Sequence, residues 1–432
     1  MAALVGFHLA GAVVMMVESL GAGVGRDRAT KGIPDEGGRE QHMLELTELY
    51  NRVKAAGRLS VDFARYGRPG VMPPRPGDGA VVLDRVRGAL LGGAVGDALG
   101  RTLEFAGYPH PRWVEHYQPG EDPDDPGFCR PPGAITDDTQ LTMWLAESLL
   151  ERGGLDPEDV VRRFTTSTIR GIGIATSQFV ANCRQGLPWD RCGVRSAGNG
   201  VAMRSAPVGL FYGRDFGSLK LAAGLQALIT HNDPMAIASG IMVAYAVARL
   251  VAEPRSALDP LEARITFCRD LAGIIEGMET GEAEMGSGRA GSRRTGSEQA
   301  GGREAASSYR NRQGMPDSLC RRVGTRIPEL LAAGATAGEV QEEFGSSAYV
   351  LESLPFAIFC FLQSPHDFRR TLLHAVNLGE DSDTTGAMAC TLSGAYNGAN
   401  AIPAEYLEGL EYRFWLEGLA AGLAERWQHS DA

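Results

Sequence analysis

Lysine is nearly absent from this chain of 432 residues: of its 42 basic residues, only Lys31, Lys54 and Lys220 are lysines, and the others are arginines. The chain also has 53 aspartates and glutamates, which gives a formal net charge of −11. Proteins that hold phosphate backbones rely on a basic surface, and this charge balance disfavours one. The composition therefore predicts no nucleic-acid partner.

Cysteine pairs with metal-ligand or redox spacing are also missing. The seven cysteines are scattered, their number is odd, and no two have the C-x-x-C spacing. This pattern indicates neither a disulfide framework nor a zinc site built from thiolates. We expect a protein of the reducing cytoplasm.

Long hydrophobic runs are a third absence. No stretch of about 18 uninterrupted apolar residues follows the N-terminal leader, which disfavours a transmembrane span. The leader, residues 1–24, is apolar and glycine-rich, but it contains His8 and Glu18 and lacks the basic start of a secretory signal. We expect a disordered extension or a start codon assigned too early, and we predict no membrane association.

The remaining composition supports a folded, helical core. Hydrophobic residues make up 44% of the chain, which is ample for a core and excludes global disorder. From Val81 onward, apolar residues recur with helical spacing over segments of about 12 to 20 residues, separated by Gly and Pro, and strand-like alternation is scarce. The pattern predicts an all-α fold.

Changes in composition divide the chain. Residues 1–80 are predicted to be an N-terminal extension, partly disordered, with one short helix at Met43–Ala56 and a turn-rich end, GRPGVMPPRPGDG. The core is predicted at 81–425 and a C-terminal tail at 426–432. Within the core, residues 277–314 are Gly, Ser, Arg and Glu with almost nothing apolar, which predicts a flexible insertion.

The segment Arg87–Phe105 combines an apolar helix face with five glycines, although each glycine costs about 1 kcal/mol relative to Ala in a helix. So many glycines indicate a second helix or a ligand packed very close. Asp97 precedes Glu104 by seven residues, two helical turns, so both carboxylates can share one face. The alternative is that Asp97 bonds a neighbouring backbone group while Glu104 is solvated.

Two other predicted helices begin with clusters of oxygen ligands. Thr136, Asp137 and Asp138 precede one apolar helix face, and Asp381, Asp383 and Thr384 precede a helix with a small-residue face. A single Asp or Thr at such a position is an ordinary helix cap. Adjacent carboxylates with hydroxyls are instead the hard ligands that magnesium, manganese or calcium prefer.

The total charge of the four aspartates distinguishes a metal site from a polar cluster without metal. Four aspartates in one place repel one another by several kcal/mol unless cations intervene or protons are retained. Two divalent ions would balance the charge of the four, leaving Thr136 and Thr384 as neutral ligands. This arithmetic favours a dinuclear site, provided that the two helix starts meet.

A fourth segment combines backbone flexibility with a cation. Gly198, Asn199 and Gly200 allow a ligand to approach the backbone closely, and Met203-Arg204 follows before another apolar run. Exposed amides near a helix start suit phosphate. The alternatives are a tight turn with Arg204 in a surface ion pair. Farther along, His231 either contacts a ligand or caps the next helix.

Five stretches, in this order, resemble the ADP-ribosylglycohydrolase family, which includes dinitrogenase reductase-activating glycohydrolase. They are GALLGGAVGDALGRTLEF, ITDDTQLTMWLAESLL, GNGVAMRSAPVGL, THNDPMAIASG and VNLGEDSDTTGAMACTLSGAYNGANAIP. The resemblance covers residues 81–425, with 277–314 as an insertion. It implies a compact, single-domain helical fold of the ADP-ribosylglycohydrolase type around a dinuclear metal site.

The resemblance also implies roles for individual residues. Two Mg²⁺ or Mn²⁺ ions are expected on the T-D-D and D-x-D-T motifs, and ADP-ribose is expected along the G-N-G-x-x-M-R segment and near the T-H-x-D-P histidine. Glu104 is expected in a loop that moves over the metals in some members. One departure is Glu380, where many members have glycine. The implied sets are metal ligands Thr136, Asp137, Asp138, Asp381, Asp383 and Thr384; catalytic Glu104 and Asp138; and substrate-binding Asp97, Gly198, Asn199, Gly200, Met203, Arg204 and His231.

The implied reaction is hydrolysis of the bond between ADP-ribose and an arginine of a modified protein. Cleavage of an O-linked ADP-ribose, on serine or on a small molecule, is the alternative reaction, and a non-catalytic binding or structural member of the same fold is the alternative class. All four aspartates of the two motifs are present, which argues against a site that has lost its catalytic function. The extension of residues 1–80 is interpreted either as a dispensable leader or as an arm that docks a cognate ADP-ribosyltransferase.

Overall fold

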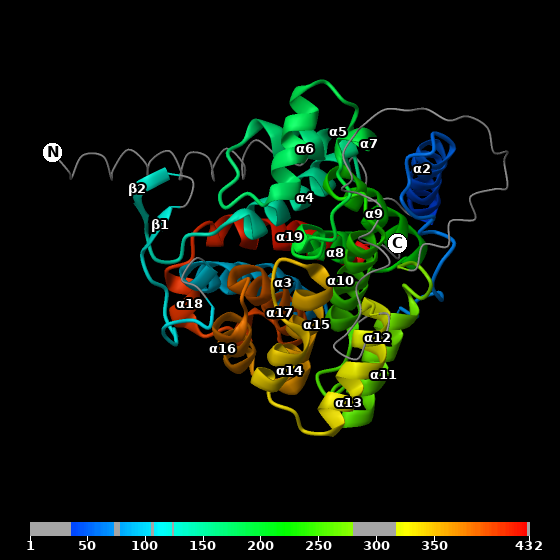
Figure 1. Cartoon of the computed structure of the whole chain (residues 1–432). Coiled ribbons are helices and arrows are strands. Elements are labelled where there is room, and N and C mark those ends of the chain that lie inside the picture. The colour runs from blue at the N-terminus through cyan, green and yellow to red at the C-terminus, as the bar shows by residue number, and fades with distance from the viewer. Residues whose placement is uncertain (1–35, 73–77, 105–107, 123–124, 280–316, 430–432) are drawn as a thin grey trace, which may run out of the picture.

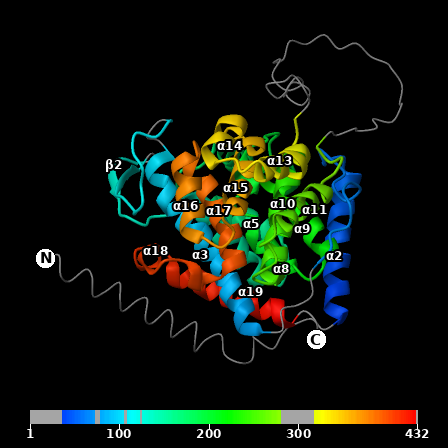
Figure 2. The same ribbon diagram turned by 90° about the horizontal axis from the view of Figure 1, so that it is seen from below.

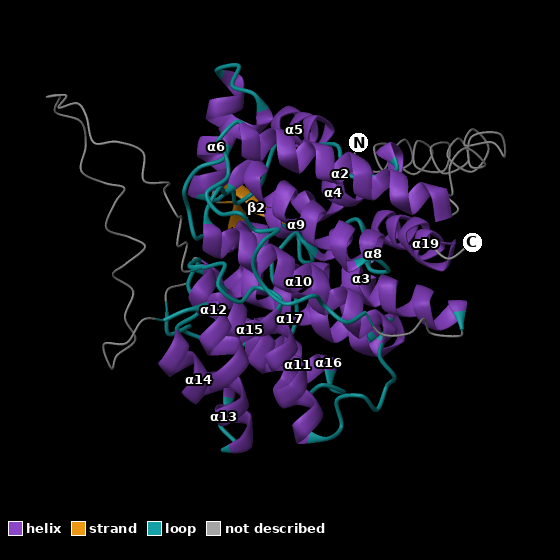
Figure 3. Cartoon of the chain, turned by 90° about the vertical axis from the view of Figure 1, so that its right-hand side faces the viewer, coloured by secondary structure: helices purple, strands orange, loops and turns teal. Residues whose placement is uncertain are grey.

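The computed structural model describes residues 36–72, 78–104, 108–122, 125–279 and 317–429. This part of the chain is built from helices, with a single antiparallel ribbon of two strands, β1 (Gly120–Asp122) and β2 (Asp125–Arg130) (Figures 1 and 3). The expectation of a helical fold is confirmed. The leader at 1–24 and most of the predicted insertion lie outside the described residues.

The helices follow one another along the whole described chain. In its first half they are α2 (Glu36–Ala55), α3 (Gly79–Glu104), α4 (Asp137–Arg152), α5 (Pro157–Thr166), α6 (Ile174–Arg184), α7 (Trp189–Cys192), η1 (Asn199–Val201), α8 (Ala206–Tyr212), α9 (Phe216–Thr230) and α10 (Pro234–Ala252). In its second half they are α11 (Leu261–Gly273), α12 (Leu319–Arg321), η2 (Arg322–Arg326), α13 (Ile327–Ala332), α14 (Ala337–Phe344), α15 (Val350–Gln363), α16 (Phe368–Leu378), α17 (Ser382–Asn397), η3 (Ala399–Ala401), α18 (Ala404–Glu408) and α19 (Arg413–His429).

Helices α3 and α17 lie side by side through the centre of the molecule (Figures 1 and 2). Their glycines face each other: a Cβ on Gly96 would lie 2.1 Å from the Gly386 carbonyl oxygen, and one on Gly394 would lie 1.9 Å from that of Gly88. Both distances are far below van der Waals contact, so only glycine allows the two backbones to approach this closely. The partner predicted by the glycines of Arg87–Phe105 is therefore α17.

Helix α10 is the most apolar long helix of the described chain. Its length and composition would allow it to cross a membrane, but 89% of its most apolar stretch is buried inside the protein. It packs against α8, α9, α15 and α17. Its composition is that of a core helix surrounded by other helices.

The predicted helix at Met43–Ala56 is observed as the longer α2, packed against α9. Leu46, Tyr50 and Val53 are buried, and the chain after the helix buries Phe63 against α9. Farther on, the Tyr245 hydroxyl donates to the Val71 carbonyl at 3.0 Å. The described residues before α3 thus cover an apolar face of the core, while their dispensability stays a prediction.

The ends of the predicted insertion are joined by a side chain. Glu279 accepts hydrogen bonds from the backbone N–H groups of Leu319 and Cys320, at 2.6 and 3.0 Å. These N–H groups open α12 and have no partner within the helix. The chain therefore leaves and re-enters the core at one place.

Candidate metal centre and ligand pocket

The two predicted oxygen clusters meet at the N-termini of α4 and α17. The Thr384 hydroxyl of α17 donates to Asp138 Oδ2 of α4 at 3.2 Å, and the Thr136 hydroxyl lies 3.4 Å from the same oxygen. The close packing of α3 on α17 places a third helix end beside them. The condition that the sequence argument set for a shared site is met.

The third helix end contributes Glu104. One carboxylate oxygen each of Glu104, Asp381 and Asp383 lies within 4.8 Å of the other two, close enough to hold a metal ion. Glu104 was expected in a loop, but it is the last residue of α3, so a helix fixes where its backbone lies. Residues 105–107 beyond it are outside the description.

Asp97 lies deeper than Glu104 on the same face of α3 and is fully buried. Its carboxylate accepts from the backbone N–H and the hydroxyl of Thr136, and from the same two groups of Thr139, at distances between 2.5 and 3.1 Å. The two N–H groups lie at the start of α4 and have no partner within the helix, and the Thr136 side chain does not cap them. Asp97 thus bonds a neighbouring backbone, as the alternative interpretation held; its role in substrate binding stays a prediction.

Two residues that the sequence argument missed also hold the start of α4. The Arg170 carbonyl accepts from the Asp137 N–H at 2.9 Å, and the Arg170 guanidinium forms two bonds with Glu411, at 2.6 and 3.1 Å. Glu411 in turn accepts from the Ile135 N–H at 3.2 Å. Arg170 and Glu411 are 241 positions apart and belong to no local motif, so no pattern in the sequence indicates this pair.

Burial and mutual repulsion decide the electrostatics of the cluster. Desolvation, with the charge of neighbouring carboxylates, raises the pKa of Asp137, Asp138 and Asp383 well above the usual range. Desolvation, together with Asp381 and Asp97, raises the pKa of Glu104 to about 7. Two buried carboxylate oxygens, Asp138 Oδ1 and Glu104 Oε2, lack a hydrogen-bond donor among the described residues. Oxygens of this kind fit a divalent cation.

The turn at Gly198–Gly200 lies against this cluster. Asn199 Nδ2 donates to Asp381 Oδ2 at 2.6 Å and to Ser353 Oγ at 3.2 Å. The turn is fixed from the other side because the Asn199 N–H donates to the Ala348 carbonyl at 3.0 Å. Asn199, predicted to bind substrate, therefore also orients a predicted metal ligand.

Arg204 and His231 are both buried, which removes one alternative for each. Arg204 is fully buried, so it is not in a surface ion pair, and its guanidinium bonds Gly200, Gln226 and Thr230. His231 does not cap the next helix, because Asp233 accepts from the Met235 N–H at the start of α10. His231 instead follows Thr230, the last residue of α9, as the C-cap of that helix.

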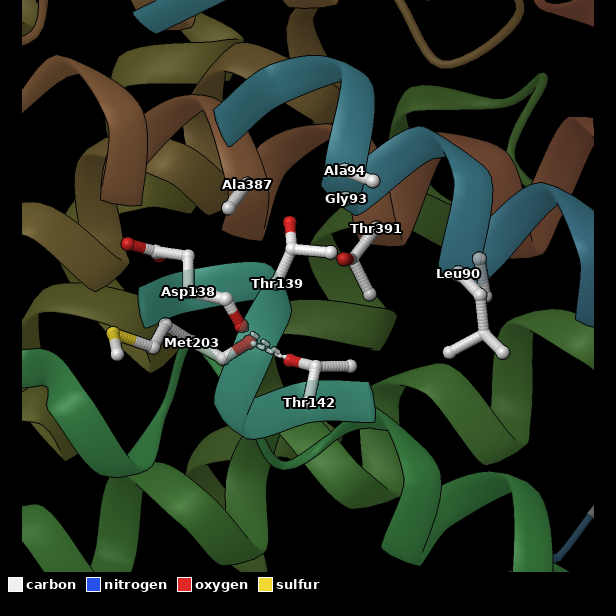
Figure 4. Close-up of a pocket in the computed structure, with 10 residues that line it drawn as sticks. Leu90, Gly93, Ala94, Asp138, Thr139, Thr142, Met203, Ala387 and Thr391 are labelled. Atoms are coloured by element: carbon white, nitrogen blue, oxygen red, sulfur yellow. Dashed lines mark hydrogen bonds between the residues drawn. The ribbon is translucent and has the colours of Figure 1, made fainter. Parts of the chain in front are cut away.

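A small pocket adjoins the cluster between α3, α4 and α17 (Figure 4). Asp138 and Met203 lie on one side of it and Leu90 on another, and the Thr142 hydroxyl donates to the carbonyls of Asp138 and Met203 at 2.7 and 3.5 Å. Its lining residues are Ala89, Leu90, Gly93, Ala94, Asp138, Thr139, Thr142, Met203, Ala387 and Thr391. Met203, predicted to bind substrate, is thus placed beside Asp138.

A family model described as ADP-ribosylglycohydrolase matches residues 78–432. A solved structure titled ADP-ribosylglycohydrolase-related protein complex matches with a TM-score of 0.55 and 27% identity, covering 80% of this chain and 99% of that one.

Curated relatives match over similar lengths. ADP-ribosylhydrolase ARH3 of Bos taurus is 29% identical over 81% of this chain and 94% of its own. ADP-ribosylarginine hydrolase Tri1 of Pseudomonas putida is 27% identical over 80% of this chain and 79% of its own. An uncharacterized protein of Archaeoglobus fulgidus is 29% identical over 79% of this chain and 96% of its own.

Proposed function

The chain belongs to the ADP-ribosylglycohydrolase family, whose members hydrolyse glycosidic bonds of ADP-ribose, and from this premise we propose that it removes ADP-ribose from arginine side chains of modified proteins. The observation that supports the proposal most strongly is the meeting of α4 and α17 through Thr384 and Asp138, next to Glu104. The arginine linkage is supported by the likeness to Tri1, whose name states it.

The residues present fit the divalent metal on which the family depends. Asp138 Oδ1 and Glu104 Oε2 are buried acceptors without a donor among the described residues, and the neighbouring carboxylates repel one another. We propose two ions, Mg²⁺ or Mn²⁺, held by Thr136, Asp137, Asp138, Asp381, Asp383 and Thr384. When bound, such ions supply positive charge that orients sugar hydroxyls and acidifies water.

The side chains of the site have distinct tasks in this proposal. Breaking the bond at the anomeric carbon develops positive charge on the sugar, and buried carboxylates stabilise that charge strongly because little water screens them. Asp138 or Glu104 accepts the proton of the attacking water, since each has a carboxylate oxygen without a donor among the described residues. The carboxylic acid so formed gives that proton to the nitrogen of the leaving arginine as its bond to the anomeric carbon breaks. Asp97 and Asn199 hold α4 and Asp381 in place, so the acceptors need not reorganise.

One assay tests the reaction and its linkage together. The purified full chain is incubated with arginine-linked and serine-linked ADP-ribosyl peptides, with Mg²⁺, with Mn²⁺ or with EDTA, and released ADP-ribose is quantified. We expect metal-dependent release from the arginine-linked peptide. Release from the serine-linked peptide alone would favour the O-linked alternative, and release from neither would favour a binding protein.

A further inference from the structure

The guanidinium of Arg204 is fully buried and turned into the protein. It stacks over the ring of Phe164 at 5.4 Å, and its Nε donates to Gln226 Oε1 at 3.0 Å. Its Nη1 donates to the Gly200 carbonyl at 3.0 Å, and its Nη2 donates to the Thr230 hydroxyl oxygen at 2.7 Å. These contacts link α9 to the turn at Gly198–Gly200.

The Arg204 contact fixes the direction of the next hydrogen bond. A guanidinium can only donate, so the Thr230 oxygen accepts from Arg204 and its own hydrogen must go to another atom. Thr230 Oγ1 lies 2.7 Å from His231 Nδ1. Among the described residues, this nitrogen is the acceptor recorded within reach of the fully buried hydroxyl. Thr230 therefore donates to Nδ1.

This direction determines the tautomer of His231. An imidazole nitrogen that accepts a hydrogen bond carries no proton, so the proton of the neutral ring is on Nε2. Burial and the charge of Arg204 lower the pKa of His231 to about 3, so the ring stays neutral at physiological pH. His231 is then a fixed donor through Nε2–H.

The donor faces the glycine turn that borders the metal cluster. A Cβ on Gly198 or Gly200 would lie 3.3 or 3.4 Å from His231 Nε2, so any larger residue in the turn would crowd the ring. His231 is only 2% exposed, and within the described ranges no protein acceptor is recorded for Nε2. A donor in this position can bond an oxygen of a ligand that lies along the glycine turn.

On the basis of the proposed function, we propose that Arg204 and Thr230 are positioning residues, which hold His231 as an Nε2–H donor to an oxygen of bound ADP-ribose. Asn199 connects the same turn to Asp381, so the turn that His231 faces also contacts the metal cluster. The resemblance placed Arg204 itself along ADP-ribose; here it acts through Thr230 and His231 instead.

The first test needs no ligand. Long-range ¹H–¹⁵N NMR of the full chain with labelled histidine, assigned by His231→Gln, reports the tautomer directly. We expect Nε2–H alone, unchanged between pH 5.5 and 8.5. A proton on Nδ1, or a ring that becomes charged in this range, would overturn the inference whatever the protein hydrolyses.

The second test measures binding of ADP-ribose by calorimetry in Mg²⁺ to matched variants. Thr230→Val keeps the shape of the side chain but removes the hydroxyl, whereas Thr230→Ser keeps the hydroxyl. Loss of one neutral hydrogen bond corresponds to about a 3- to 10-fold weaker Kd. We expect that loss in Thr230→Val, with KM raised more than kcat is lowered, and recovery to within about twofold in Thr230→Ser.

Further arms separate the possible failures. If the donor meets the diphosphate, Thr230→Val weakens ADP as well as ADP-ribose; if it meets the terminal ribose, only ADP-ribose is affected. Equal affinity of wild type and a folded Thr230→Val for ADP-ribose would overturn the inference. Absence of ADP-ribose binding by the wild type, with Nε2–H in place, would overturn the proposed function and the ligand assignment, but not the tautomer.

Discussion

Buried carboxylates near α4 occur in two surroundings, and these differ in the sign of the neighbouring charges. At one of them Asp159 of α5, whose side chain is fully buried, accepts from Arg152, Arg162 and Arg163 at 2.8, 2.5 and 2.7 Å. Although burial alone raises the pKa of Asp159, these arginines hold it well below its usual range. At the other, around Asp138, the charges nearby are mainly those of further carboxylates.

The difference distinguishes a structural cluster from a functional one. A carboxylate surrounded by arginines is satisfied by the fold itself and contributes to stability. Carboxylates that are buried against one another destabilise the folded protein when no cation is bound. They keep their positions because packing elsewhere in the protein stabilises the helices that carry them. The Asp138 group therefore indicates a cation supplied from outside the chain.

The largest expected effect is on catalysis, when a carboxylate of the Asp138 group is replaced. Asp381→Ala removes a predicted metal ligand and is expected to lower kcat/KM about a thousandfold, equivalent to about 4 kcal/mol. The matched control is Glu380→Ala, which removes the exposed neighbouring carboxylate and is expected to leave activity within about twofold. Hydrolysis of an ADP-ribosyl peptide measures both. Full activity of Asp381→Ala would show that the ligands are placed wrongly.

A second difference concerns metal and stability. Because an ion at the Asp138 group would bind only the folded state, Mg²⁺ or Mn²⁺ at a hundred times its Kd should stabilise the protein by about 2.7 kcal/mol, and EDTA should reverse this. Thermal melts with and without chelator measure the shift. It should disappear in Asp381→Ala; a wild type indifferent to EDTA would contradict the metal centre.

Amide substitutions should have opposite signs in the two groups when metal is absent. Asp159→Asn removes the buried charge that pairs with three arginines and is expected to cost about 1–3 kcal/mol. The cost is reduced because Arg163 keeps its ion pair with Glu147 and because Arg152 and Arg162 are half exposed. Asp383→Asn relieves repulsion and is expected to be neutral or stabilising by up to about 1 kcal/mol. Urea unfolding in EDTA measures both, with Glu158→Gln, the exposed neighbour of Asp159, as a control. Destabilisation by Asp383→Asn would contradict the comparison.

The two groups should also depend on pH in opposite directions. The folded-state pKa of Asp159 is lowered, so its contribution to stability is present above pH 3.8 and is lost as the pH falls further. The pKa of Glu104 is raised from 4.5 to about 7, so the metal-free protein loses stability as the pH rises through that interval. Unfolding curves in EDTA should show that Glu104→Gln flattens the neutral limb and Asp159→Asn the acidic limb.

The helical class and the two Thr/Asp clusters at helix starts could be predicted from the sequence alone, and the assignment of those clusters as metal ligands stays a prediction. Helical periodicity and glycine spacing are local properties, so they predict that another helix or a ligand packs closely at Gly96, but they do not identify it. Two Thr/Asp clusters at helix starts carry enough repulsion to suggest a metal wherever they meet. The motif order identified the family, which the match over residues 78–432 confirms.

Only the tertiary structure decided which groups face one another. Asp97 turns out to hold the first turn of α4, and Arg204 acts within the core, because the burial of each depends on helices distant in sequence. The ion pair of Arg170 with Glu411 joins residues 241 apart. The periodicity of apolar residues predicts which face of a helix is buried, but it does not predict which helix packs against that face. The packing between helices also decides the direction of a hydrogen bond and the pKa of a buried carboxylate.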